Sequence, residues 1–265
     1  MNQPLAYVHP QAKIAANVVI EPFATIHKNV EIGDGTWIGS NVTIMEGARI
    51  GKNNRIFPGA VISAIPQDLK FEGEDTVVKI GDNNTIREFV TINRGTKANI
   101  ETTVGNNNLI MAYAHIAHDC VIGNHTILAN SVTLAGHIIV DNFAILGGLV
   151  AVHQFVKVGA HSMVSGGSLV RKDVPPFVKA AREPLSYVGV NSIGLRRRGF
   201  TAEQINEIQE IYRVLYLKGN NVSQAVRIIE VEMPATNERD EILSFIASSN
   251  RGIMRGYSRS GNGLL

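Results

Sequence analysis

An aliphatic residue recurs at every sixth position over most of the first 170 residues of the chain. A helix would bury every third or fourth residue and a simple strand every second, so a period of six fits neither alone. The residue four places further on is usually small or β-branched, and Gly, Asn and Asp crowd the positions between. Three runs carry this register: Val8, Ile14, Ile20, Ile26, Ile32, Ile38, Ile44, Ile50, Ile56 and Ile62; Ile80, Ile86 and Ile92; and Val104, Ile110, Ile116, Ile122, Leu128, Leu134, Val140, Leu146, Val152, Val158, Val164 and Val170.

A short strand followed by a turn explains this period. Each six-residue unit buries its first and fifth residues, and its Gly, Asn and Asp residues adopt the backbone angles that a corner needs. Three units close a triangular coil of about 18 residues, and successive coils stack at the strand spacing of roughly 4.8 Å. Stacking pairs every strand and leaves open edges only at the two ends. We therefore expect a mainly β protein.

The repeat resembles the hexapeptide-repeat acyltransferase family, whose fold is a left-handed parallel β-helix. The left-handed winding is what the resemblance implies, because general topology rules would favour right-handed crossovers. Repetition of this length is hard to obtain by chance.

Two segments break the register with polar residues at positions that the coil would bury. The first lies near residues 63–78 and contains Gln67, Asp68 and Lys70, and the second lies near residues 94–103. Polar residues at core positions indicate that both segments leave the prism as loops. The polar residues of the first segment indicate a binding loop, whereas the second segment is equally compatible with a tolerated insertion.

The pattern of the chain becomes helical after the last repeat. Thr201 opens a TAEQ stretch with the spacing of a capping box, followed by apolar residues at helical spacing. Two further helices are expected over residues 223–232 and 237–250. We therefore predict a β-helix acyltransferase domain over residues 1–184 and a small helical C-terminal domain over residues 185–265.

Bulk composition narrows the class of protein. The formal net charge is +2 without a polybasic run, which argues against nucleic acid as a partner. A single cysteine, Cys120, excludes an internal disulfide and fits a reducing compartment. The N-terminus lacks a basic segment followed by an apolar run, and no segment approaches membrane-spanning length. We expect a cytoplasmic protein without a membrane span.

Four histidines lie within a short stretch of chain, and the coil period decides which of them lie together. In a coil of about 18 residues, residues n and n+18 lie one above the other. His118 then lies beneath Gly136, and Gly136 beneath Gln154, while Asp119 lies beneath His137. These five residues should form one patch on one corner of three adjacent coils.

The patch could serve a metal or a catalytic base. Zinc needs three or four converging ligands, and the hexapeptide-repeat carbonic anhydrases use two histidines separated by four residues, whereas two residues separate His115 from His118. A general base needs one neutral imidazole, an orienting partner and an oxyanion donor, and the patch offers each type. We favour the base and expect no metal. His125 occupies the fourth place of its unit and is expected to be a solvated turn residue.

Six motifs make the resemblance more specific, and they cover essentially the whole chain. They are similar to those of the UDP-N-acetylglucosamine O-acyltransferases of lipid A biosynthesis. The resemblance implies transfer of a 3-hydroxyacyl group from acyl carrier protein to the 3-hydroxyl of UDP-N-acetylglucosamine. It implies no cofactor, since the acyl group arrives on the phosphopantetheine of the carrier. The motifs are QDLK, AHIAHDC, TLAGH, AVHQF, DVPP and GLRRRGF.

The resemblance assigns roles to the patch. His118 is the expected general base, Asp119 orients its ring, and the backbone amide of Gly136 faces the oxyanion. Cys120 lies at an inward fifth position, so we expect a buried core thiol and not a nucleophile.

Other motif residues are candidates for holding the sugar nucleotide or the pantetheine arm. Guanidinium forks match phosphate oxygens, although the RRR run also fits a solvated charged surface. The family stretch commonly reads Asn-Ile-Glu-Gly-Leu, but this chain has Ile193 where the glutamate is expected. One contact with the sugar nucleotide must therefore differ or be absent. The expected binding residues are Asp68, Lys70, His115, His137, Gln154, Asn191, Arg197 and Arg198.

The resemblance also implies a homotrimer with active sites between neighbouring prisms, and an acyl-chain ruler at Gly166. A glycine there leaves the groove open, so a long 3-hydroxyacyl donor is expected.

Two alternative functions remain. The N-acyltransferase of the same pathway normally carries an extra N-terminal uridine-binding domain, for which repeats beginning at Val8 leave no room. A non-catalytic β-helical scaffold would need no His118 patch.

Overall fold

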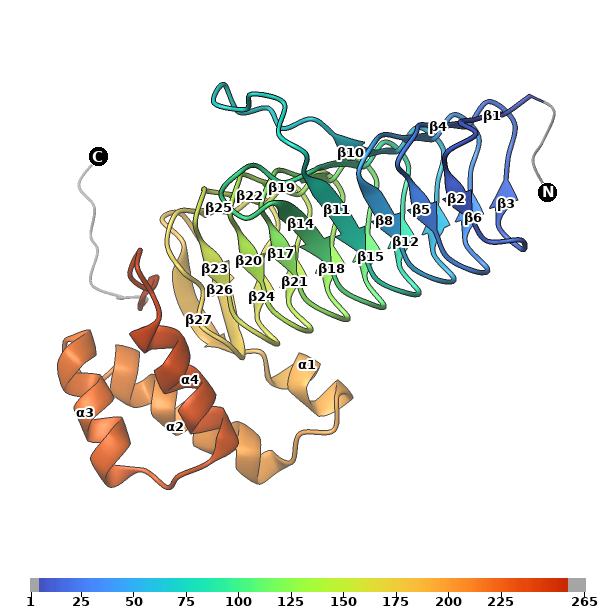
Figure 1. Ribbon diagram of the computed structural model, residues 1–265. Helices are drawn as coiled ribbons and strands as arrows, with labels where there is room; N and C mark the ends of the chain where they lie inside the picture. The colour runs from blue at the N-terminus through green and yellow to red at the C-terminus, as the bar shows by residue number, and fades with distance from the viewer. Residues whose placement is uncertain (1–4, 257–265) are drawn as a thin grey trace.

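The computed structural model describes residues 5–256 of the chain. Within this range the chain winds into an elongated three-sided prism, and four helices gather at its C-terminal end (Figure 1). Each side of the prism is one sheet. As far as Val170, consecutive strands of the chain belong to successive sides, so the neighbours within a sheet are parallel and one coil apart. The architecture is a parallel β-helix.

We number the three sheets in the order in which the chain visits them. Sheet 1 contains β1 (Tyr7–Val8), β4 (Thr25–Ile26), β7 (Thr43–Ile44), β10 (Val61–Ala64), β13 (Thr91–Asn93), β16 (His115–Ile116), β19 (Thr133–Leu134), β22 (Ala151–Val152) and β25 (Leu169–Val170). Sheet 2 contains β2 (Lys13–Ile14), β5 (Glu31–Ile32), β8 (Ala48–Ile50), β11 (Val77–Ile80), β14 (Glu101–Val104), β17 (Val121–Ile122), β20 (Ile139–Val140) and β23 (Lys157–Val158). Sheet 3 contains β3 (Val19–Ile20), β6 (Trp37–Ile38), β9 (Arg55–Ile56), β12 (Thr85–Ile86), β15 (Leu109–Ile110), β18 (Ile127–Leu128), β21 (Ile145–Leu146), β24 (Met163–Val164), β26 (Val178–Ala181), β27 (Ser186–Val190) and β28 (Arg255–Gly256).

The core of the prism consists of the first and fifth residues of the six-residue units. Ile56 and Val132, for example, are fully buried. Val8 and Ile14 are only partly covered, because the first coil has no described coil beneath it. The expected inward positions are therefore confirmed along the prism.

The corners explain the polar residues of the repeat. The fourth residue of nearly every unit adopts a left-handed backbone conformation, as in Asn107 (φ 59°), Asp119 (φ 59°) and His137 (φ 60°). Asparagine, aspartate and glycine tolerate this conformation best among the amino acids. We call the corners that follow sheets 1, 2 and 3 corner 1, corner 2 and corner 3. Asp119 and His137 both lie at corner 1.

Two loops leave the prism, and both leave at corner 1. The segment 65–76 connects β10 to β11 and projects from the prism, and the segment 94–100 connects β13 to β14 (Figure 1). Residues that lie one above the other are 18 apart in regular coils, and the offset rises to 30 and to 24 where the loops intervene. The loops therefore lengthen two coils without changing the register of the sheets.

The helices follow the expected order. Thr201 caps the second helix with a capping box, in which its side chain accepts from the Gln204 N–H and the Gln204 side chain accepts in return. The last helix ends three residues before the expected residue 250, in a Ser-Ser-Asn run that favours caps and turns over helix. One short helix, capped by Asn191, was not expected. The helices are α1 (Ser192–Arg197), α2 (Ala202–Tyr216), α3 (Val222–Glu232) and α4 (Asn237–Ala247).

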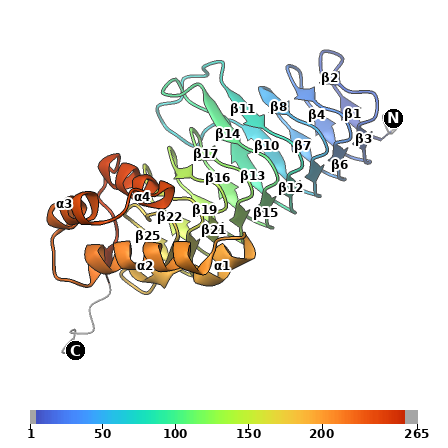
Figure 2. The same cartoon turned by 90° about the horizontal axis from the view of Figure 1, so that it is seen from below.

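The C-terminal segment covers the open end of the prism. β27 runs antiparallel to β26 within sheet 3 and contacts α2. Figure 2 shows the helices gathered at the β25 end of the prism. The buried carboxylate of Asp173 accepts hydrogen bonds from the Lys157 N–H at 2.8 Å and from the Ser249 hydroxyl at 2.5 Å, which joins prism and tail. The domain division at residues 184/185 stays a prediction, since β27 still pairs with the prism. Over residues 5–256, the helices are too short or too polar to cross a membrane.

The inward register predicts unequal effects of truncation on the same sheet. Ile56→Ala removes a fully buried side chain and should lower the free energy of unfolding by about 2–5 kcal/mol. Val19→Ala shortens an exposed side chain on the outer face and should cost less than about 1 kcal/mol. Urea denaturation followed by circular dichroism measures both, and equal losses would contradict the assigned faces.

Candidate active site

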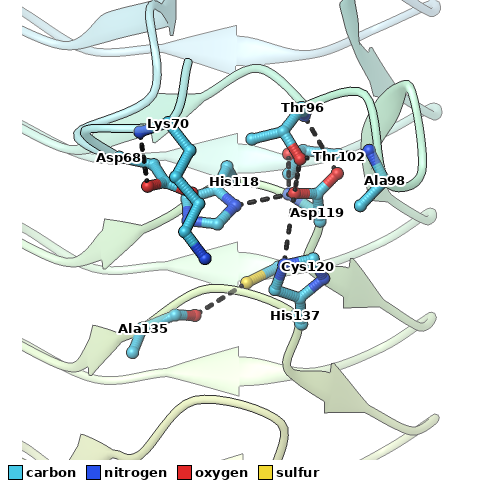
Figure 3. A network of polar contacts seen from close by, with 10 residues as sticks. All are labelled: Asp68, Lys70, Thr96, Ala98, Thr102, His118, Asp119, Cys120, Ala135 and His137. Carbon is cyan, nitrogen blue, oxygen red and sulfur yellow. Dashed lines mark hydrogen bonds and ion pairs between the residues drawn. The ribbon is translucent and has the colours of Figure 1, made fainter.

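Corner 1 brings the predicted patch together. The His137 N–H donates to the His118 carbonyl at 3.0 Å, and the Phe155 N–H donates to the Gly136 carbonyl at 3.2 Å, so the corner residues of successive coils stack as expected. The rings of His118 and His137 are in edge-to-face contact, with centroids 5.1 Å apart. Figure 3 shows both rings beside the carboxylate of Asp119.

His118 and Asp119 form a buried hydrogen-bonded pair. Nδ1 of His118 lies 2.6 Å from Oδ2 of Asp119. The same carboxylate accepts hydrogen bonds from the N–H and the hydroxyl of Thr96, at 3.0 Å and 2.7 Å, and the Asp119 N–H donates to the Thr102 hydroxyl. Burial alone would raise the pKa of Asp119, but the hydrogen bonds from His118 and Thr96 outweigh burial and hold this pKa below its usual value.

The pair fixes the tautomer of the imidazole. An ionised carboxylate only accepts hydrogen bonds, so Nδ1 of His118 carries the proton and Nε2 of the neutral ring holds the free lone pair. Nε2 is therefore the atom that can accept a proton from a substrate.

Gly136 is required by the close approach of this ring. A Cβ atom at residue 136 would lie 2.5 Å from Cε1 and 2.6 Å from Nε2 of His118, distances that no side chain could occupy without displacing the imidazole. Within residues 5–256, the Gly136 N–H has no hydrogen-bond acceptor. A proton acceptor and a free backbone donor therefore adjoin each other, which is the arrangement that acyl transfer needs.

His137 completes the corner. Its Nε2 lies 3.6 Å from Oδ2 of Asp119, and its ring stacks on Phe155 with centroids 4.7 Å apart. Burial lowers the pKa of His137, although Asp119 and Asp68 act in the opposite direction. A neutral His137 at physiological pH can donate or accept one hydrogen bond toward a substrate.

The same three side chains are the cluster within residues 5–256 that could hold a metal ion, with ligand atoms of His118, Asp119 and His137 within 4.8 Å of one another. The 2.6 Å separation of Nδ1 and Oδ2 is that of a hydrogen bond. Ligands about 2.0–2.2 Å from a tetrahedral zinc lie farther apart than this. The geometry fits a proton relay better than a metal site, and the absence of metal stays a prediction.

The first loop, residues 65–76, lies close to the patch of the same chain. Asp68 is half-buried, its charge acts on His137, and its carboxylate accepts from the Lys70 N–H at 3.0 Å. The exposed side chain of Lys70 crosses in front of His118 in the view of Figure 3. The loop thus brings one anionic and one cationic side chain to corner 1.

His115 and Gln154 border the patch. His115 lies on the outer face of β16, where its Nδ1 is 2.7 Å from the Thr91 hydroxyl, and burial and the nearby His118 lower its pKa. Gln154 is half-buried one coil beyond Gly136. His115 therefore lies close to His118, whereas Gln154 lies two coils from it along the same corner.

The predicted phosphate-binding residues lie on another edge of the prism. The Asn191 side-chain amide donates to the His161 carbonyl at 3.0 Å. The Arg198 guanidinium donates to the Phe143 carbonyl at 3.1 Å and covers the Phe143 ring at 5.2 Å. Arg197 is exposed on α1. These residues belong to corner 2, so within one chain they are not brought to His118.

Gly166 also lies away from the patch, at corner 3. A Cβ atom there would lie 3.0 Å from the Gly148 carbonyl oxygen, so the two glycines stack as expected. A pocket of about 320 Å³ adjoins the last strand of sheet 1 between corner 3 and corner 1. Its lining consists of Leu169, Arg171, Lys172, Pro184, Leu185, Met254 and Arg255.

Sequence reasoning identified the core cysteine but missed two site residues. Cys120 is fully buried, its Sγ donates to the Ala135 carbonyl at 3.1 Å, and burial raises its pKa to about 12. A nucleophilic thiolate is therefore excluded at neutral pH. Thr96 and Thr102 were not predicted. Thr102 occupies an inward fifth position, but buried polar residues such as Thr36 and Thr126 occupy such positions as well, so its position alone did not distinguish it.

Known proteins resemble this chain over most of its length. The family described as Udp N-acetylglucosamine O-acyltransferase; Domain 2 matches residues 173–254, and the bacterial transferase hexapeptide repeat matches residues 29–64 and 101–136. The acyl-[acyl-carrier-protein]--UDP-N-acetylglucosamine O-acyltransferase of Paracidovorax citrulli is 52% identical over 201 residues, which are 74% of this chain and 77% of that protein. The Thiobacillus denitrificans enzyme of the same name is 46% identical over 191 residues, 72% of this chain and 74% of its own.

Solved structures agree. The UDP-N-acetylglucosamine acyltransferase of Bacteroides fragilis superimposes with a TM-score of 0.95 at 54% identity, covering 96% of this chain and 100% of that chain. The Francisella novicida enzyme gives a TM-score of 0.94 at 46% identity and covers 96% and 94%. The predicted fold, a left-handed parallel β-helix followed by helices, is thereby confirmed. The chain belongs to the family of UDP-N-acetylglucosamine O-acyltransferases.

Proposed function

We propose that the protein transfers a 3-hydroxyacyl chain from acyl carrier protein to the 3-hydroxyl of UDP-N-acetylglucosamine, the first step of lipid A biosynthesis. The His118–Asp119 pair against Gly136 carries this proposal, because it combines a proton acceptor with a free backbone donor. Family membership supplies the two substrates. The single cysteine fits a reducing cytoplasm.

The geometry supports direct transfer without an acyl-enzyme. Nε2 of His118 removes the proton of the sugar 3-hydroxyl as its oxygen attacks the thioester carbonyl, and Asp119 stabilises the imidazolium that forms. The Gly136 N–H then donates to the oxyanion of the tetrahedral intermediate. Collapse of the intermediate breaks the carbon–sulfur bond, and the leaving thiolate takes the proton from His118. No cofactor takes part in these steps, since the acyl group is delivered on phosphopantetheine.

The distribution of binding residues supports a homotrimer. The predicted residues Asp68, Lys70, His115, His137 and Gln154 lie at corner 1 or on the adjoining face of sheet 1. Asn191, Arg197 and Arg198 lie at corner 2, and sheet 2 separates these corners. A diphosphate bound at corner 1 reaches such arginines only if a neighbouring copy supplies them. Corner 3 also exposes large apolar side chains, which contact between copies would cover. They are Phe23, Phe89, Tyr113 and Leu149.

The outer face of sheet 1 offers a track for the acyl chain. Moving from His115 toward the C-terminal end, the residues paired one above another are Thr133, Ala151 and Leu169. This track becomes more apolar with distance from the base and ends at the pocket that Leu169 lines. Gly166 precedes Leu169 in the same coil, where a larger side chain would narrow the track. We therefore infer a long 3-hydroxyacyl donor.

The rim of that pocket suits an acidic carrier. Arg171, Lys172 and Arg255 surround its apolar floor, and Lys179, Arg182 and Arg213 lie on the same C-terminal part of the chain. Arg171 is paired with Glu183 at 2.7 Å, so we expect the exposed Lys172 and Arg255 to make the stronger contacts with the carrier. Complementary charge of this kind accelerates encounter more than it stabilises the complex.

Purified protein should convert UDP-N-acetylglucosamine and a 3-hydroxyacyl carrier protein into the 3-O-ester. His118→Ala should lower kcat by at least about a hundredfold, because the attacking hydroxyl loses its proton acceptor. His27→Ala is the matched control, since it lies on the same edge about 19 Å away, four coils at the strand spacing. An amide product, no turnover by the unmodified protein, or His118→Ala activity above about a tenth would contradict the proposal.

Carrier docking should depend on salt. The Michaelis constant for acyl carrier protein should rise steeply between low and physiological ionic strength, because exposed charges are screened beyond a Debye length of about 8 Å. The constant for a short acyl-pantetheine, which lacks the acidic protein, serves as control and should change little. A carrier constant that is independent of salt would contradict basic docking.

Substitution at residue 166 tests the acyl track. Gly166→Met should sharply reduce turnover of long donors and spare short ones, because its side chain narrows the track beside Leu169. Gly166→Ala introduces the same close contact of Cβ with the Gly148 carbonyl but little bulk, so it separates corner strain from obstruction. Uniform losses over all chain lengths in both variants would show a damaged corner and no ruler.

A further inference from the structure

Within residues 5–256, Thr96 in the second loop is the residue that donates two hydrogen bonds to the Asp119 carboxylate. Its N–H donates to Oδ1 of Asp119 at 3.0 Å, and its hydroxyl donates to Oδ2 at 2.7 Å (Figure 3). Both residues are buried. Oδ2 is also the atom that Nδ1 of His118 contacts at 2.6 Å, so the hydroxyl and the imidazole share one acceptor.

The direction of the Thr96 hydroxyl is determined by its neighbours. The Ala98 N–H donates to the Thr96 oxygen at 3.3 Å, which occupies one of its acceptor sites. A hydroxyl has a single hydrogen, and the ionised Asp119 carboxylate can only accept. The hydrogen therefore points at Asp119, and this contact is a charge-assisted hydrogen bond.

The segment 94–100 is built to hold Thr96 in this position. The Ile100 N–H donates to the Thr96 carbonyl at 2.7 Å and closes the loop on itself. The Gly95 N–H donates to the Val77 carbonyl at 3.2 Å, and a Cβ atom on Gly95 would collide with the backbone nitrogen of Glu101. A merely tolerated insertion would not need so many fixed contacts, so we infer that this loop has a role in the site.

Asp119 has a competing partner that makes such control useful. Nε2 of His137 lies 3.6 Å from the same Oδ2, slightly beyond hydrogen-bond distance. A small rotation of the carboxylate would exchange His118 for His137 as its partner. The two hydrogen bonds from Thr96 oppose that rotation.

We propose that Thr96 is a positioning residue for the transfer reaction, which holds the Asp119 carboxylate toward His118 and thereby keeps the proton on Nδ1 and the lone pair on Nε2. The inference rests on the proposed function for its kinetic consequences, but the tautomer it describes is a property of the free protein. Thr96 acts through Asp119 and touches no substrate.

Kinetics of hydroxyl-deleted and hydroxyl-retaining variants test this role. Thr96→Val removes the hydroxyl at nearly constant volume and should lower kcat by at least about tenfold with the Michaelis constants changed less than about threefold. Thr96→Ser keeps the hydroxyl and should retain more than about half of the activity. Thr85→Val is the matched control, because Thr85 lies half-buried on sheet 3 and should leave the rate unchanged. Equal loss in Thr96→Val and Thr96→Ser would overturn the proposal.

Coupling to Asp119 provides a second criterion. In an Asp119→Asn background, Thr96→Val should have no further effect on kcat, since both changes remove one function. Multiplicative losses would mean that Thr96 acts by another route and would overturn the proposal.

The ring tautomer can be read without turnover. Nitrogen-15 NMR of histidine-labelled protein should assign the Nδ1-protonated form to His118 in the unmodified chain and a mixture of tautomers in Thr96→Val. An unchanged tautomer in Thr96→Val would overturn the positioning role. Because this measurement needs no substrate, it separates failure of this inference from failure of the proposed reaction, which the unmodified enzyme's turnover decides.

Discussion

Vertical registry between coils is the constraint on which the rest of the structure depends. The strands between residues 5 and 256 are only two to five residues long, and those inside the prism are stabilised by backbone hydrogen bonds to the coils on either side. A local change of register would therefore break the ladder above and below it. The buried aliphatic column enforces the register, because a slip of one residue would expose it. Loops are therefore tolerated only where they leave and return at the same corner, as segments 65–76 and 94–100 do.

The active corner follows from this registry with few additions. The third and fourth residues of a unit face outward at a corner, so two consecutive coils are enough to stack His118 and Asp119 against Gly136 and His137. The left-handed conformation of the fourth residue turns Asp119 toward the adjacent ring, where a 2.6 Å contact forms. The repeat alone does not provide hydrogen-bond donors for the Asp119 carboxylate. The inserted loop provides them through Thr96.

This division explains what the sequence could predict. A period of six predicts a three-sided stack of coils, the buried positions and the column of the patch, because each depends only on residue number modulo the coil, whereas the left-handed winding followed from the family resemblance. Thr96 and Asp68 lie in inserted loops that do not follow the six-residue period. Their positions near corner 1 therefore could not be predicted from residue number. Arg198 illustrates the opposite case: the motif identifies its chemistry, but its position at corner 2 depends on how the tail folds back onto Phe143.

The balance at Asp119 shows why the loop and the corner have to act together. Burial disfavours the ionised carboxylate, and a neutral Asp119 would neither orient the imidazole nor stabilise its protonated form. Hydrogen bonds from His118 and Thr96 reverse this tendency, so the site excludes water without losing the charge that the reaction uses. Such a site differs from a solvated His–Asp pair, since its dipoles are already oriented before the proton moves. An acyl chain bound along sheet 1, as we propose, would exclude water further and strengthen each of these contacts.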